Sequence, residues 1–296
     1  MSILNVLKFI TTHPLNRQRP LAAVGRFVKW QIASRLAPGD IVHPWVGDSK
    51  FLVRNGETGL TGNIYTGLHE FPDMAYLLHA LRQDDLFVDV GANVGSYTIL
   101  ACAVVGASGI AFEPVPATHR RLTENIRLNH LERSVRCLNI GLGRRPETIR
   151  FTSEMDTVNH VLAEGEAHAG SIEVEVSTLD MVLAQASPNF MKIDVEGYET
   201  PVLDGALETL AKPTLHSVII ELNGSGERYG HDESLILRKM LDNGFKTYSY
   251  DPFARRLINL GGKNLASGNT LFIRDEKMVA KRLQSAPKFA VNGTWL

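Results

Sequence analysis

A strand followed by a glycine turn and a helix, over residues 86–100, constrains the fold of this chain more than any other stretch. Leu86–Val90 is mostly apolar and rich in branched or aromatic side chains, which is typical of a strand buried in a parallel sheet. The turn carries Gly91 and Gly95, and glycine permits a positive φ and the close approach of a ligand. The helix from Ser96 presents free backbone N–H groups at its start. We predict a nucleotide or nucleoside site at this turn.

The residues within the turn disfavour a dinucleotide. The dinucleotide fingerprint G-x-G-x-x-G has a glycine in its middle position, where Asn93 stands here. Asp89 precedes the turn, and its carboxylate would repel a pyrophosphate but suits a cationic ligand with an amino group, such as the methionine end of S-adenosylmethionine. Glu113 ends the next apolar run, 22 residues after Gly91, close to the spacing of roughly 20 for a ribose-binding acid.

Length and composition bound the class of protein. A chain of 296 residues can bury a full α/β core, and its net charge of −1 gives no sign of sequence-independent nucleic-acid binding. The two cysteines, in apolar segments without metal-ligand spacing, favour a reducing, cytoplasmic setting. No apolar run reaches the roughly 18 residues of a membrane span, and we expect no signal peptide.

The first 39 residues carry six basic side chains and no acidic one. Apolar residues recur there at helical spacing, at Val24, Phe27, Val28, Ile32 and Leu36. Two interpretations stay open. The segment is a basic amphipathic helix for a membrane surface or an acidic partner, or it is a helix that covers the main domain with its cations facing water.

Alternating strands and helices from residue 86 onward predict right-handed crossovers and a mainly parallel sheet. We expect strands at 86–90, 109–113, 135–140, 190–194 and 216–222, and helices at 95–104, 116–130, 178–186 and 199–210. Further expected elements are a strand at 50–54, a helix at 71–81, an inserted or edge pair at 148–152 and 172–176, a helix at 234–241, and strands at 245–250 and 270–274.

Acidic side chains end several of the expected strands. Asp194 and Glu196 straddle the turn after the fourth strand, just before Gly197, and Glu221 ends the fifth. Ligands of an open parallel sheet lie beyond the carboxyl ends of its strands. We therefore expect these acids to lie at the same edge as the glycine turn.

Three blocks in this order resemble the FkbM family of S-adenosylmethionine-dependent methyltransferases: the turn Asp89–Gly95, the pair Glu113-Pro114, and residues 192–199. The resemblance covers roughly residues 60–275. It implies the Rossmann-like class I α/β fold, with a mostly parallel sheet of seven strands, the last antiparallel, and helices on both faces. We expect a basic helical and hairpin extension at 1–60, the methyltransferase domain at 61–275, and a tail at 276–296.

The resemblance also implies O-methylation of a hydroxyl on a sugar, glycan or secondary metabolite. By position, the turn would hold the methionine end of the cofactor, Glu113 the ribose hydroxyls, and residues 139–141 would lie near the adenine. The cofactor-binding residues expected on this basis are Asp89, Gly91, Ala92, Asn93, Gly95, Ser96, Glu113, Pro114, Asn139, Gly141 and Asp194.

A hydroxyl is a poor nucleophile until its proton leaves, so a base is expected nearby. Asp194 is the first candidate, with Glu196 orienting the acceptor hydroxyl, and His69 and His160 are other candidate bases. Alternatively Asp194, Glu196 and Glu221 hold Mg²⁺ or Ca²⁺, which would lower the pKa of the hydroxyl.

Two rival functions remain: a nicotinamide-dependent oxidoreductase, which Asn93 disfavours, and a non-catalytic interaction module that keeps the cofactor fold. The expected partners are a small-molecule or glycan acceptor and a second copy of the chain, with peripheral membrane contact through the basic segment as an alternative and no nucleic acid.

Overall fold

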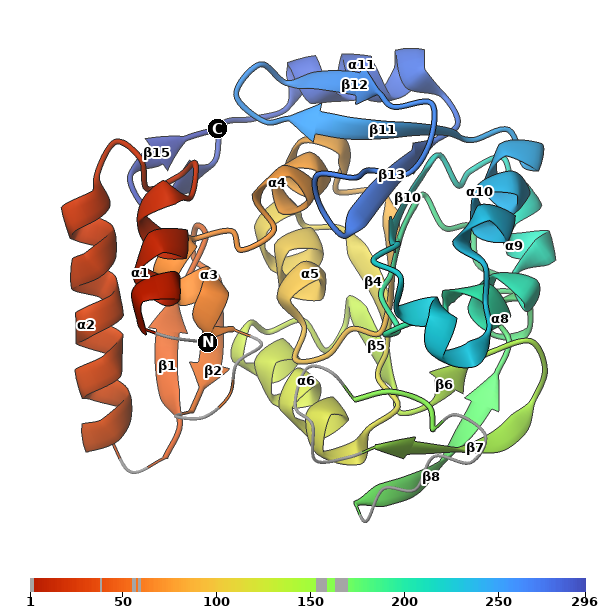
Figure 1. Ribbon diagram of the computed structural model, residues 1–296, viewed down its shortest axis with the longest axis horizontal. Coiled ribbons are helices and arrows are strands. Elements are labelled where there is room, and N and C mark those ends of the chain that lie inside the picture. The colour runs from red at the N-terminus through yellow and green to blue at the C-terminus, as the bar shows by residue number, and fades with distance from the viewer. Residues whose placement is uncertain (1–2, 38, 55–56, 58–59, 153–158, 163–169) are drawn as a thin grey trace.

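An eight-stranded sheet forms the centre of the protein (Figure 1). The structure is a computed structural model that describes residues 3–37, 39–54, 57, 60–152, 159–162 and 170–296. The strand order is β12-β11-β13-β10-β9-β3-β4-β5. The bounds are β3 (Leu86–Val90), β4 (Ser108–Phe112), β5 (Val135–Leu138), β9 (Phe190–Ile193), β10 (Ser217–Glu221), β11 (Lys246–Asp251), β12 (Arg256–Asn259) and β13 (Asn269–Ile273).

The pairing confirms the mainly parallel sheet. Strands β5, β4, β3, β9 and β10 are parallel, and β13 is antiparallel to both β10 and β11. The sheet has one strand more than the expected seven, because β12 returns antiparallel along β11 and forms the edge. The Asp251 carboxylate shapes this return by accepting the backbone N–H groups of Phe253 and Ala254.

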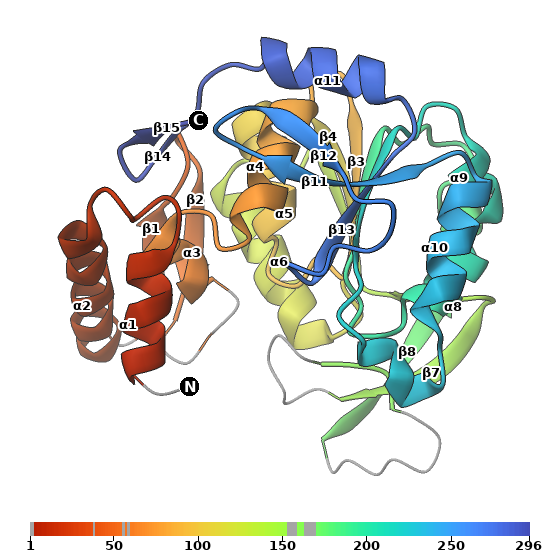
Figure 2. The same cartoon turned by 45° about the horizontal axis from the view of Figure 1, so that its top comes forward.

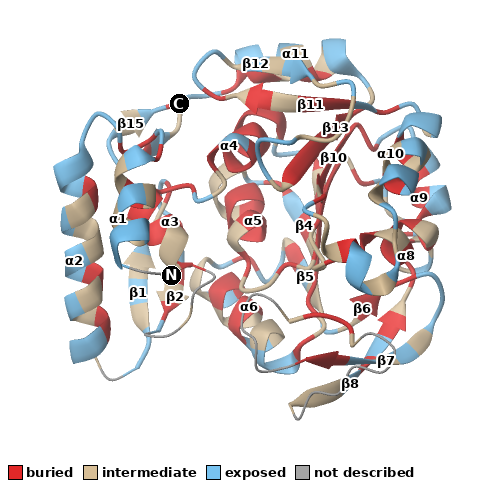
Figure 3. Cartoon of the chain, viewed as in Figure 1, coloured by how far each residue is buried: buried red, intermediate tan, exposed pale blue. Residues whose placement is uncertain are grey.

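Helices cover both faces of the sheet, as expected (Figures 1 and 2). Adjacent residues of β3 point to opposite faces, so Phe87 and Val88 belong to different apolar clusters. One face packs against α4 (Phe71–Ala80), α5 (Ser96–Ile99), η1 (Leu100–Val105), α6 (Pro116–Leu128) and α11 (Glu276–Ser285). The other packs against α7 (Leu179–Val182), α8 (Glu199–Asp204), α9 (Leu207–Ala211) and α10 (Glu233–Asp242). Figure 3 shows the buried residues concentrated between these layers.

Two expected helices are shorter than their patterns predict. The helix at 199–210 is divided into α8 and α9 at Gly205, where a Cβ would lie 2.1 Å from the carbonyl oxygen of Gly143. Only a glycine permits this contact, and no helical pattern reveals it. The helix at 178–186 is reduced to α7, which the Thr178 side chain caps by accepting the N–H of Met181.

Two smaller units flank the main sheet. The expected pair β7 (Glu147–Thr152) and β8 (Ser171–Ser177) is antiparallel, and with β6 (Gly141–Leu142) it forms a separate three-stranded sheet. The N-terminal unit comprises α1 (Ile3–Thr12), α2 (Pro20–Leu36), the hairpin β1 (Ile41–Pro44) and β2 (Lys50–Val53), and α3 (Thr61–Thr66), which share an apolar cluster.

The C-terminal segment packs onto the main domain. Val279 and Leu283 of α11 are buried in the same cluster as α4, and a short hairpin of β14 (Ala290–Val291) and β15 (Thr294–Trp295) follows. The remaining short element is η3 (Ser225–Tyr229). Within the described residues, no helix is long and apolar enough to cross a membrane.

Candidate active site

A cavity of about 430 Å³ lies at the carboxyl ends of β3, β4 and β9. It brings together the glycine turn, Glu113 and the acids after β9, as the sequence predicted. The predicted residues that line it are His69, Asp89, Gly91, Ala92, Asn93, Ser96, Glu113, Pro114, Gly141, Asp194 and Glu196. Its volume is within the usual range of ligand pockets, roughly 300–1,000 Å³.

The glycine turn is held against its two neighbouring strands. The N–H groups of Gly91 and Ala92 both donate to the carbonyl oxygen of Phe112, at the end of β4. Gly91 has a φ of +79°, and a Cβ there would lie 1.8 Å from the carbonyl oxygen of Asp194, after β9. The turn therefore presents bare backbone to the cavity and contacts the acid-bearing strand end directly.

Glu113 is fixed by the turn that it faces. Its carboxylate accepts the N–H of Asn93 and the N–H of Val115, each at 3.0 Å. Burial raises the pKa of Glu113 to about 7, although these two donors favour the ionised form. Asn139 lies outside the cavity lining and donates its side-chain N–H to the carbonyl oxygens of Glu113 and Pro114, so it holds this loop in place.

Asp89 lines the cavity and is almost fully buried. The Thr98 hydroxyl donates to its Oδ2 at 2.5 Å. Burial raises the pKa of Asp89 to about 6 against this hydrogen bond. Near neutral pH the Asp89 side chain is therefore a buried carboxylate, and one of its oxygens already accepts a hydrogen bond from Thr98.

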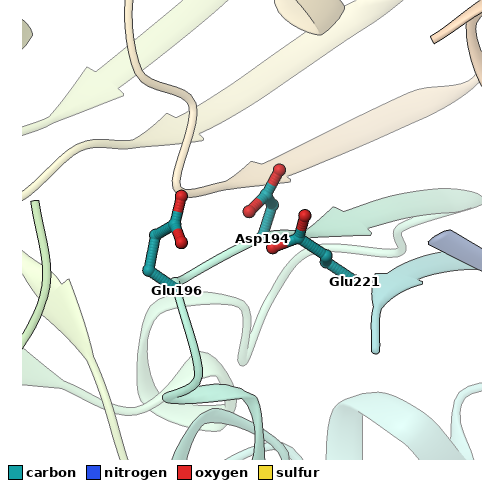
Figure 4. Close-up of side chains that lie close together, drawn as sticks. All are labelled: Asp194, Glu196 and Glu221. Carbon is teal, nitrogen blue, oxygen red and sulfur yellow. The ribbon is translucent and has the colours of Figure 1, made fainter. Parts of the chain in front are cut away.

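Three carboxyl groups lie close together, from Asp194, Glu196 and Glu221 (Figure 4), and the first two of them line the cavity. One oxygen from each lies within 4.8 Å of the others. The ammonium of Lys192, which is fully buried, lies 2.9 Å from Oδ2 of Asp194. Burial alone would lower the pKa of Lys192, but the charges of Asp194 and Glu70 raise it above its usual value.

Within this cluster Asp194 and Glu221 share a proton. Burial and the negative charge of Asp194 raise the pKa of Glu221 to about 9. Burial alone would raise the pKa of Asp194, but Lys192 and the hydrogen bond from Glu221 lower it below the usual value. At neutral pH, Asp194 is a carboxylate and Glu221 a protonated acid that donates to it. The Lys192 ammonium pairs with the Asp194 carboxylate, and Glu196 adds a third acidic group to the cluster.

Glu196 differs from the other two acids of the cluster. Its backbone has a φ of +53°, a conformation that is costly for a residue other than glycine and common at functional sites. No residue that the structure describes hydrogen-bonds its carboxylate. Burial and the charges of Asp194 and Glu199 raise its pKa to about 7.

The sequence did not predict the polar network beneath this cluster. Glu70 accepts a hydrogen bond from the Tyr97 hydroxyl at 2.8 Å and another from the side chain of Asn269 at 2.7 Å. The Tyr97 ring lies 5.2 Å from the Lys192 ammonium. In the sequence, only the position of Glu70 next to the candidate base His69 pointed to this network. His69 itself is exposed and packs edge-on against Phe9.

Among the candidate bases, His160 stands apart from the cavity lining that the structure describes. It is buried beside β7, where its carbonyl oxygen accepts the N–H of Thr152 and its own N–H donates to the Thr152 hydroxyl.

Residues 89–247 match the family model of the methyltransferase FkbM domain. The chain belongs to the FkbM methyltransferase family. The match contains the glycine turn, Glu113 and all three acids of the cluster. This FkbM-family chain is therefore a methyltransferase, as the resemblance implied, and the nicotinamide-dependent alternative is set aside.

Named relatives of this FkbM-family chain are also methyltransferases. Methyltransferase 1 of Beauveria bassiana is 28% identical over 193 residues, which cover 57% of this chain and 77% of that protein. The hexuronic acid methyltransferase AglP of Haloferax volcanii is 32% identical over 150 residues, which cover 50% of this chain and 59% of that protein.

Among solved structures, the precorrin-6Y C5,15-methyltransferase of Geobacter metallireducens resembles this chain with a TM-score of 0.41 and 12% identity, over 75% of this chain and 92% of that one.

Proposed function

We propose that this methyltransferase binds S-adenosylmethionine and methylates a hydroxyl oxygen of a sugar or glycan. The observation that carries the proposal is the single cavity that joins the bare turn at Gly91 to the acids Asp194 and Glu196. A donor site and a base are both needed for O-methylation, and here they share one space.

The described residues fit the cofactor. Gly91, Ala92 and Asn93 of the turn line the cavity, and Gly91 has no room for a Cβ because the Asp194 carbonyl packs against it. Gly95, predicted to bind the cofactor, lies outside the lining and packs toward Leu122. Asp89 would face the amino group of the methionine end, and each Glu113 oxygen keeps a second lone pair for a ribose hydroxyl. When bound, S-adenosylmethionine supplies a methyl group on a sulfonium, which is open to attack by a nucleophile.

We assign the proton transfer to Glu196 and the orientation of the acceptor hydroxyl to Asp194, the reverse of the roles inferred from sequence. A general base works best when its pKa lies near the working pH, and the pKa of Glu196 is raised to about 7. Asp194 is held ionised by Lys192, so it is a weaker base. Its side chain is 30% exposed and can accept a hydrogen bond from an acceptor hydroxyl.

The charges of the cavity favour a neutral acceptor. Its described lining holds five acids, Glu70, Asp89, Glu113, Asp194 and Glu196, against one cation, Lys192, which is buried and paired with Asp194. A hexuronate, the substrate class named for AglP, would bring a further negative charge. We therefore propose a neutral sugar hydroxyl for this chain, with repulsion of an acidic sugar.

The test uses S-adenosylmethionine labelled in its methyl group, with neutral sugars and glycans and their hexuronic acid counterparts as acceptors. We expect transfer to a neutral acceptor, little to the acidic one, and no effect of a chelator. Loss of transfer with chelator would restore the alternative in which the acids hold Mg²⁺ or Ca²⁺. Calorimetry with S-adenosylmethionine alone is the control, because failure to bind it would refute the cofactor assignment.

A further inference from the structure

The outer face of α2 carries an exposed apolar stripe. Leu21, Val28, Ile32 and Leu36 are 86%, 46%, 55% and 78% exposed, respectively. Their spacing of seven, four and four residues places them along one side of the helix. Gly25, also exposed, lies within the same stripe. Over the 17 residues of α2 the stripe is about 25 Å long.

This stripe is additional to the face that packs inward. Ala23 and Trp30 on the opposite side are buried in the cluster that α2 shares with α1 and the β1–β2 hairpin. The sequence offered two interpretations for this segment, a covering helix or a helix for a membrane surface or an acidic partner, and the inner face accounts for the first. A helix that only covered a domain would be polar on its outer side. The outer stripe therefore needs a partner of its own.

Basic side chains flank the stripe. At 100° per residue, Arg35 lies along one border and Lys29 along the other, and both are exposed. Residues 1–39 carry six basic side chains and no acid, whereas the rest of the chain carries 25 basic and 32 acidic side chains. The positive charge is thus concentrated on the unit that bears the stripe.

Helix α1 adds to the same unit. It lies beside α2 in both views (Figures 1 and 2) and exposes Ile3, Leu4 and Lys8 at its free surface. Phe9 of α1 packs edge-on against His69 of the cavity lining, so this unit adjoins the site.

We propose that the outer face of α2 binds the surface of an anionic lipid bilayer. An apolar stripe bordered by cations is the pattern of a helix that lies in the plane of a membrane interface, with its apolar side chains among the acyl chains and its cations at the headgroups. A nucleic acid would use the cations but leave the stripe exposed. A second copy would bury the stripe but offer no acidic side chain from the same segment to Lys29 and Arg35, because residues 1–39 carry none.

Vesicle flotation tests the proposal. The full chain is mixed with vesicles of phosphatidylcholine alone or with about a third phosphatidylglycerol, at low and high salt. We expect binding to the anionic vesicles only, weakened by salt. Lys29→Gln with Arg35→Gln should weaken it about 25-fold, because each cation near an anionic surface contributes about fivefold. Val28→Ser with Ile32→Ser should weaken binding at least as much.

Leu207→Ser with Leu241→Ser is the matched control, since these leucines are 56% and 52% exposed on helices away from α2. It should bind like the unmodified chain, and unchanged thermal unfolding of each variant shows that it is folded. Equal binding by the Val28/Ile32 variant and the control would overturn the proposal. So would a dimer in sedimentation that only the Val28/Ile32 substitutions dissociate, because the stripe would then be an interface between copies.

Discussion

Replacing Gly91 by alanine should damage the site more than any other one-carbon change, and Gly244 supplies the matched control. Both glycines have a positive φ, +79° at Gly91 and +81° at Gly244. A Cβ at Gly244 meets nothing within 4 Å, whereas at Gly91 it would lie 1.8 Å from the Asp194 carbonyl oxygen. The two variants therefore share the backbone strain, and only one has the steric clash.

The shared strain costs about 1–2 kcal/mol for an alanine in the left-handed region. To reach an ordinary contact of 3.4 Å, the Gly91 turn and the Asp194 carbonyl must separate by well over 1 Å. That movement breaks the hydrogen bonds from Gly91 to Phe112 and from Asp194 to Val90, each worth about 1 kcal/mol. We expect Gly91→Ala to lose about 3–4 kcal/mol of unfolding free energy, against about 1–2 kcal/mol for Gly244→Ala.

Differential scanning calorimetry resolves this difference. At about 2–4 °C per kcal/mol for a domain of this size, Tm should fall by roughly 10 °C for Gly91→Ala and by roughly 4 °C for Gly244→Ala. Isothermal titration should show S-adenosylmethionine binding lost only in the first variant, because sites tolerate shifts of about 0.5 Å. Equal Tm values together with intact binding by Gly91→Ala would refute the packing argument.

Four further outcomes follow. Glu113→Ala should weaken S-adenosylmethionine binding about tenfold or more in calorimetry, and an unchanged Kd removes the ribose role. Asp194→Asn should keep cofactor binding but lose most turnover; the reverse pattern would contradict its role toward the acceptor. Turnover should rise with pH up to about 7 as Glu196 ionises, and Glu196→Gln should have a low rate without that rise. Because the pKa of Glu221 rises from 4.5 unfolded to about 9 folded, the stability it contributes is complete below pH 4.5 and lost as pH approaches 9. Denaturation of Glu221→Gln should therefore vary less over that range, and an equal slope would contradict the shared proton.

The sequence predicted the parts of the site that are local in the chain. Strand β3, the glycine turn and the acids after β9 each have a recognisable pattern within a few residues, and parallel strands bring their carboxyl ends together. The contact between Glu70 and Asn269 joins positions 199 residues apart, and no spacing rule connects them. The division between α8 and α9 likewise depends on the carbonyl of Gly143, which only the folded chain places there.

The sequence located Asp194 and Glu196 at the site but did not distinguish their roles. Asp194 and Glu196 are two positions apart and look equivalent in the sequence, but Lys192 contacts only the first. That buried ammonium lowers the pKa of Asp194, whereas burial and the charges of Asp194 and Glu199 raise the pKa of Glu196. The sequence around Lys192 indicates only an apolar strand that contains one lysine. The burial of the Lys192 side chain against Asp194 depends on the tertiary structure.

The contact between Gly91 and the carbonyl of Asp194 also links the two proposed ligand sites to each other. Whatever displaces the turn on the donor side must displace the main chain that carries the acceptor-side acid, and the reverse is equally true. Energetic coupling of this kind is reciprocal, so each ligand changes the affinity for the other by the same factor. Changes that shift the main chain at residues 194–197 would thus alter affinity for the proposed methyl donor, whereas side-chain changes such as Asp194→Asn leave this main-chain contact in place.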